Sequence, residues 1–95
     1  MKKGSYQMKT YFEIVVTRIL ENIKKVNDES TSSEMNRIQY GCICAWSQYL
    51  RDNGHKVDFG VFRDMEKNDR LTITFFSINE DLLFDNTIAG DVNEI

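Results

Sequence analysis

Cys44 and His55 are the first residues to consider for catalysis, because a thiol beside an imidazole can act as a base-activated nucleophile. The chain has two cysteines and a single histidine. Cys44 and His55 fall within and just after one predicted helix, so they lie roughly 16 Å apart along its axis. That separation is too long for a catalytic dyad. Cys44 and His55 are the only thiol–imidazole pair with an expected exposed thiol, and we predict that the chain is not an enzyme.

A second chemical possibility is metal binding at residues 64–68. Asp64, Glu66 and Asn68 alternate as the oxygen ligands of a calcium loop do. However, Asp69 stands where the sharp turn needs glycine, and Phe75 stands where the bidentate acid belongs. Zinc lacks a ligand set, since there is one histidine and no Cys-x-x-Cys. We therefore interpret residues 64–69 as a hairpin turn and expect neither a metal nor another cofactor.

Binding is the remaining function, and the segment from Glu34 to Gly54 is its first candidate. Apolar residues recur there at helical spacing and are assigned to the core: Met35, Ile38, Cys42, Ala45, Trp46, Tyr49 and Leu50. The opposite face carries Arg37, Tyr40, Cys44, Ser47, Gln48 and Arg51. Tyrosine and arginine commonly anchor interfaces. Arg37, Tyr40, Cys44 and Arg51 are therefore the predicted binding surface on this helix.

Both ends of this helix are marked by capping signals in the sequence. Thr31-Ser32-Ser33-Glu34 matches a capping box, in which a hydroxyl and a carboxylate satisfy amides at a helix start. Asn53-Gly54 marks the other end, because glycine can adopt the left-handed conformation that closes a helix.

A first helix is predicted over Met8–Val26, from a stripe formed by Met8, Phe12, Val15, Val16, Ile19, Leu20, Ile23 and Val26. Tyr11 and Ile14 fall outside that stripe. The run 11–17 also has strong strand propensity, so a strand followed by a short helix is the alternative.

Two later segments alternate with the period of a strand. Residues 55–63 place Val57, Phe59 and Val61 on one face, and residues 70–77 place Leu71, Ile73 and Phe75 on one face. They are predicted to pair as an antiparallel hairpin. Phe62 and Phe76 fall on the second face, which suggests that this face is covered too. The short apolar run 82–84 is predicted to form a helical turn.

Together these elements predict one α+β domain over residues 1–95, with two helices packed on a two-stranded antiparallel hairpin and a short C-terminal helical turn. Residues 1–7 and about 88–95 are expected to be flexible. The hairpin edge makes a homodimer through strand pairing plausible.

Charge is unevenly distributed along the chain. The net charge is −3, yet residues 71–95 hold five acids and no base. This acidic end suits a protein partner with a basic surface, and Glu80, Asp81 and Asp85 are its predicted contacts. We therefore expect a small protein-binding module of the inhibitor, immunity-protein, antitoxin or phage-regulator type. Nucleic-acid binding through Arg37, Tyr40 and Arg51 is the alternative, which the pI near 5.1 opposes. A third hypothesis is a small enzyme or ligand binder that uses Cys44 or Tyr40.

The expected compartment is the cytoplasm. No apolar run approaches the roughly 20 residues that span a bilayer, and Lys2 and Lys3 are not followed by an apolar signal core. Cys42 and Cys44 lie two apart in the predicted helix, point about 200° apart and cannot form a disulfide with each other. We expect Cys42 to be buried and Cys44 to be an exposed thiol, with no membrane contact for the protein.

Overall fold

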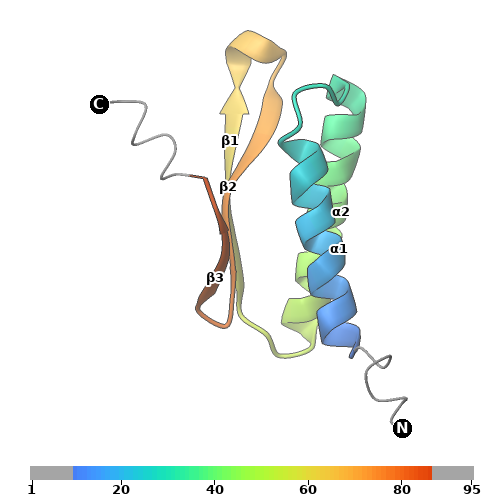
Figure 1. Ribbon diagram of the computed structural model, residues 1–95, viewed down its shortest axis with the longest axis vertical. Helices are drawn as coiled ribbons and strands as arrows, with labels where there is room; N and C mark the ends of the chain where they lie inside the picture. Colours follow the sequence, from blue (N-terminus) through green and yellow to red (C-terminus); the bar gives the residue numbers. More distant parts are fainter. Residues whose placement is uncertain (1–9, 87–95) are drawn as a thin grey trace, which may run out of the picture.

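The computed structural model describes residues 10–86, which form a two-layer α+β domain (Figure 1). Helices α1 (Tyr11–Val26) and α2 (Ser33–Asp52) are followed by strands β1 (Val57–Asp64), β2 (Arg70–Ile78) and β3 (Asp81–Asp85). A short 3-10 helix, η2 (Met65–Lys67), lies between β1 and β2. Both helices cover the same face of the sheet. The segments 1–7 and 88–95, predicted to be flexible, lie outside the described residues.

Helix α1 confirms the predicted helix over residues 11–26 and excludes the alternative strand over 11–17, but it begins at Tyr11 after the N-cap Thr10. Met8, the predicted start of the helix and first member of its stripe, lies outside the described residues. Thr10 caps it through a reciprocal capping box: the Glu13 amide donates to Thr10 Oγ1 (3.1 Å), and the Thr10 amide donates to Glu13 Oε1 (3.2 Å). The predicted stripe is also confirmed, because its members are buried or half-buried: Phe12, Val15, Val16, Ile19, Leu20, Ile23 and Val26. Tyr11 and Ile14 lie outside it and are exposed.

Helix α2 begins and ends close to the predicted positions, but its cap differs. Ser32, not Thr31, is the N-cap, and its hydroxyl accepts from the Met35 amide at 3.1 Å. Glu34 therefore stands one position too early to complete the predicted capping box. At the other end, Asn53 is the C-cap and Gly54 has φ +90°, as predicted for a left-handed closing residue.

The predicted core stripe of α2 is only partly correct: Leu50 is buried and Trp46 packs against the core as predicted, but the other large members of the stripe are turned outward about the helix axis. Met35, Ile38 and Tyr49, all assigned to the core, are 42%, 51% and 40% exposed. The buried residues are Asn36, Ile43, Ser47 and Leu50, with Tyr40 and Trp46 half-buried beside them. Both stripes have helical spacing, and the buried one contains two polar residues. A hydropathy pattern alone therefore selects the exposed stripe.

The hairpin of β1 and β2 is confirmed, and a bulge modifies its predicted faces. Gly60 pairs with Phe75 and Val61 with Ile73, so Thr74 is the extra residue on β2. The bulge shifts the alternation by one residue. Ile73 and Phe76 are consequently both fully buried, although the sequence places them on opposite faces. Phe62 is 55% exposed, so the predicted cover over its face is not seen at this position among the described residues.

Residues 81–85 form a third strand, which corrects both the predicted helical turn and the predicted two-stranded hairpin. The sheet order is β1-β2-β3, with β3 antiparallel to β2. Asn79 and Glu80 connect the two strands with φ values of 51° and 75°. Two consecutive positive φ angles match the tight type I′ turn, whose twist suits a hairpin.

β3 pairs with β2 only from Phe75 onward. Before Phe75, side chains from the helical layer form hydrogen bonds with the backbone groups on that edge of β2. Asn27, the C-cap of α1, donates to the Ile73 carbonyl (3.0 Å) and accepts from the Ile73 amide (2.8 Å). This pair of bonds imitates a strand neighbour and joins the two layers.

Candidate interaction surfaces

The four residues predicted as a binding surface on α2 lie along the side of the helix that meets the hairpin. Arg37 Nη2 donates to the Asn68 carbonyl at the hairpin tip (3.2 Å). Arg51 donates from Nε and Nη2 to the Val57 carbonyl at the start of β1 (3.2 and 2.8 Å). Both guanidinium groups are thus held against the protein's own backbone. Their remaining donors are the part of this surface that a ligand could use.

Tyr40 lies between these two arginines and is half-buried. Its ring packs edge-on against Phe59 of β1, with ring centroids 6.2 Å apart. Burial raises the pKa of the Tyr40 phenol, and a hydrogen bond with the Cys44 thiol adds to that rise. Tyr40 and Cys44 are therefore a contact pair inside the α2–β1 junction. Cys42 and Cys44 are both half-buried free thiols, although a buried Cys42 and an exposed Cys44 were expected.

The three predicted acidic contacts gather around β3. Glu80 lies in the β2–β3 turn, where its Oε2 pairs with Lys56 Nζ at 3.1 Å, and both side chains are highly exposed. Asp81 opens the strand and is exposed, and Asp85 closes it and is half-buried. Asp81 and Asp85 are four residue steps apart along the strand, or about 13 Å at 3.3 Å per residue.

Between these two acids β3 exposes two apolar side chains that the sequence analysis treated only as a short anchor. Leu82 is 57% exposed and Leu83 is 42% exposed, whereas Phe84 packs on the core. β3 is also an edge strand, and within residues 10–86 its second side has no strand neighbour. We name residues 80–85 the β3 edge. It combines an open strand, two leucines and three acids.

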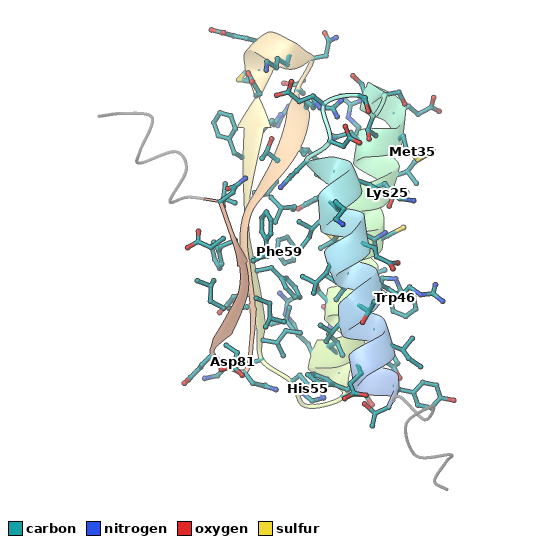
Figure 2. The ribbon with its side chains drawn as sticks, in the orientation of Figure 1. Lys25, Met35, Trp46, His55, Phe59 and Asp81 are labelled. Atoms are coloured by element: carbon teal, nitrogen blue, oxygen red, sulfur yellow. The ribbon has the colours of Figure 1, made fainter. Side chains whose placement is uncertain are left out.

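A second apolar surface lies on α2, and the sequence analysis missed it by assigning it to the core. We name it the outer stripe, formed by Met35, Ile38, Cys42, Ala45 and Tyr49. Figure 2 shows Met35 on the side of the helical layer away from the sheet, while Phe59 lies between the layers. The signal for it in the sequence is the pair Asn36 and Ser47, which repeat at helical spacing beside the stripe and occupy the core instead.

A hollow of about 480 Å³ lies where the α1–α2 connection meets the hairpin. Its lining includes two acids, Glu29 and Asp64, and two bases, Lys67 and Arg70. Arg70 donates to the carbonyls of Thr31 and Asp28 and thereby ties β2 to the connection. Hydrogen bonds from the backbone and side chain of Ser30 lower the pKa of Asp28 there. The balanced charges of the lining do not select a ligand of one sign.

Within residues 10–86, the structure does not assemble the Cys44–His55 pair or the metal site that the sequence first suggests. Cys44 interacts with Tyr40, whereas the His55 ring packs on Phe12 with centroids 4.5 Å apart, and His55 Nδ1 lies 3.1 Å from Asn79 Nδ2. The thiol and the imidazole thus belong to different clusters. No group of three or more His, Cys, Asp or Glu in this range could hold a metal ion. Neither described helix has the length and apolarity to cross a membrane.

Comparisons with protein-family models, with curated proteins and with solved structures each yield no significant match to this chain.

Proposed function

We propose that this protein is a small binding module that acts by occupying the surface of another protein through its β3 edge. The observation that carries the proposal is the exposure of Leu82 and Leu83 between acids on an open strand. An exposed edge offers backbone groups to an added strand, and apolar side chains supply contact area. The acids Glu80, Asp81 and Asp85 favour a partner with a basic surface.

The pairing of Glu80 with Lys56 is compatible with this proposal. The two side chains are 71% and 79% exposed, so the bond between them is worth under about 1 kcal/mol. A basic group on a partner can therefore compete for the Glu80 carboxylate at little cost to the fold.

Nucleic-acid binding through Arg37, Tyr40 and Arg51 has weaker support. The two guanidinium groups donate to backbone carbonyls of the hairpin, and Tyr40 packs on Phe59. A single-strand binder would instead present free aromatic faces along a basic groove.

The experiment that tests the proposal is affinity capture with tagged protein from lysate of the source organism, at moderate salt, followed by mass spectrometry. The variant E80K/D81K/D85K should lose a stoichiometric protein partner that the wild type retains. The matched control E21K/E29K/E66K makes the same change in net charge at exposed acids elsewhere, and it should keep the partner.

Purified partner then gives the affinity directly. Reversal of the β3 edge should weaken binding at low salt and flatten its salt dependence, because the removed attractions are the ones that salt screens. A partner retained equally by both triple variants would place the binding surface elsewhere. Co-eluting nucleic acid that salt washes away, with no protein partner, would favour the alternative.

A further inference from the structure

We propose that the outer stripe of α2 is the seam of a symmetric dimer in which α2 packs antiparallel against α2 of a second copy. This inference is independent of the partner proposed for the β3 edge, because that edge belongs to the sheet (Figure 1) and the outer stripe belongs to α2, where Figure 2 shows Met35 on the side away from the sheet.

The first argument is the spacing of the stripe. Met35, Ile38, Cys42, Ala45 and Tyr49 are alternately three and four residues apart, which is the heptad spacing of a helix-to-helix seam. The seam runs about 21 Å along the helix at 1.5 Å per residue. A partner that follows a period of 3.5 residues over this length is itself a helix.

The second argument is that the fold leaves much of this stripe exposed, although Met35 Sδ accepts from Gln39 Nε2 at 3.6 Å and the Tyr49 ring packs edge-on against Trp46 with centroids 6.2 Å apart. Ile38 and Tyr49 each stand two positions after a buried residue, Asn36 and Ser47, and therefore point about 200° away from the core. Ile38 is 51% exposed and Met35 is 42% exposed. Large apolar side chains at heptad spacing are thus left facing outward.

Residue sizes and charges favour a second copy over a different helix. Between Ile38 and Tyr49 the flanking residues, Gln39, Gly41, Trp46 and Gln48, are uncharged, so the central part of the pairing brings no like charges together. An antiparallel pairing places Ile38 opposite Tyr49 of the partner subunit and the small Cys42 opposite Ala45 of the partner subunit. Large residues then pack at both ends, and small residues at the centre allow the helices to approach closely.

Asp52 argues against a parallel pairing. It occupies the next heptad position after Tyr49. A parallel dimer would place two Asp52 carboxylates face to face. The antiparallel dimer separates them and places Asp52 near Glu34 and Met35 of the partner subunit, where the positive N-terminal end of that helix offsets part of the repulsion between the two acids.

Sedimentation equilibrium over a range of about 1–500 μM tests the proposal. The wild type should show a reversible monomer–dimer equilibrium, and I38E should raise its dissociation constant by at least about 100-fold, because it places a charge in a desolvated seam. The control V61E introduces the same charge at a 43% exposed residue of β1 and should leave the equilibrium unchanged. A wild type that is monomeric throughout overturns the proposal, as does a dimer that V61E dissociates and I38E does not.

Disulfide trapping tests the pairing without relying on the folding of I38E. With C44S as the background, A45C should give a disulfide-linked dimer on mild oxidation with diamide, because the introduced thiol lies opposite Cys42 of the partner subunit. C44S alone should remain largely unlinked. Efficient linking of C44S alone would mean that Cys42 meets its own copy in a parallel pair, and would overturn the proposed arrangement.

Discussion

Asn36 and Leu71 exchange two hydrogen bonds across the layers: the Leu71 amide donates to Asn36 Oδ1 (3.0 Å), and Asn36 Nδ2 donates to the Leu71 carbonyl (2.9 Å). The same side-chain amide group also donates to the Val26 carbonyl at 2.9 Å, near the end of α1. One fully buried side chain thus joins α1, α2 and β2. Asn27 makes the equivalent pair of bonds to Ile73. Together the two asparagines form hydrogen bonds with the part of the β2 edge that β3 does not pair with.

Asn36→Ala should lower the free energy of unfolding by about 2–4 kcal/mol, because it leaves buried backbone groups of Leu71 and Val26 without partners. Urea unfolding measures the change. Asn53→Ala is the control, since Asn53 is exposed and its side chain makes a single bond, to the Tyr49 carbonyl at 2.8 Å. That variant should lose less than about 1 kcal/mol. Equal losses in the two variants would contradict the role assigned to Asn36.

Gly60→Ala should destabilise the hairpin. An added Cβ would lie 2.5 Å from Thr74 Oγ1 and 2.7 Å from the Phe75 ring, which covers this position beside the bulge. We expect a loss of about 1–3 kcal/mol, as for other overpacked sites.

Gly41→Ala is the matched control for that prediction. No atom beyond its own helix and neighbours lies within 4 Å of the added Cβ, and the position is helical, so a gain of about 0.5–1 kcal/mol is expected. Both variants are compared by thermal unfolding at a concentration at which the protein is monomeric. Stabilisation by G60A would show that the Phe75 ring does not close this position.

Ser47→Ala should leave stability unchanged or raise it by up to about 1 kcal/mol, because the Ser47 hydroxyl is buried without a hydrogen-bond partner among the described residues. Ser32→Ala should have the opposite sign, with a loss of about 1 kcal/mol, because Ser32 caps α2. Differential scanning calorimetry of the two variants distinguishes the two effects. A clear loss in S47A would reveal a partner for the hydroxyl.

Tyr40 should make the fold sensitive to alkaline pH. The pKa of its phenol is raised above the ordinary value of 10.0 in the folded state, so the unfolded chain releases this proton first. Stability from Tyr40 is therefore fully present below about pH 10 and is lost as pH rises toward the higher folded pKa.

Thermal midpoints from pH 8 to 11, in reducing buffer, measure this effect. Tyr40→Phe keeps the packing on Phe59 and should flatten the alkaline loss, while it changes stability little near pH 8. If Y40F and the wild type lose stability in parallel above pH 10, Tyr40 is not the group responsible.

Local sequence was sufficient for the two helices, the β1–β2 hairpin and the α+β class. Helical periodicity predicts the end of α1 at Val26, Gly54 marks the end of α2, and strand alternation predicts β1 and β2, because these signals act between residues close in the chain. The start of α1 was predicted at Met8, whereas the Thr10 cap begins the helix at Tyr11. The acidic character of residues 80–85 was also visible directly in the sequence.

The tertiary structure alone decided the rotation of α2, the faces of β2 and the existence of β3. Two stripes of α2 repeat at helical spacing, and the one with Asn36 is buried because Leu71 and Val26, distant in sequence, satisfy its amide. The bulge at Thr74 depends on pairing with Gly60, and β3 depends on pairing with β2. Hydrogen bonds between distant residues settle these features, and hydropathy along the chain does not report them.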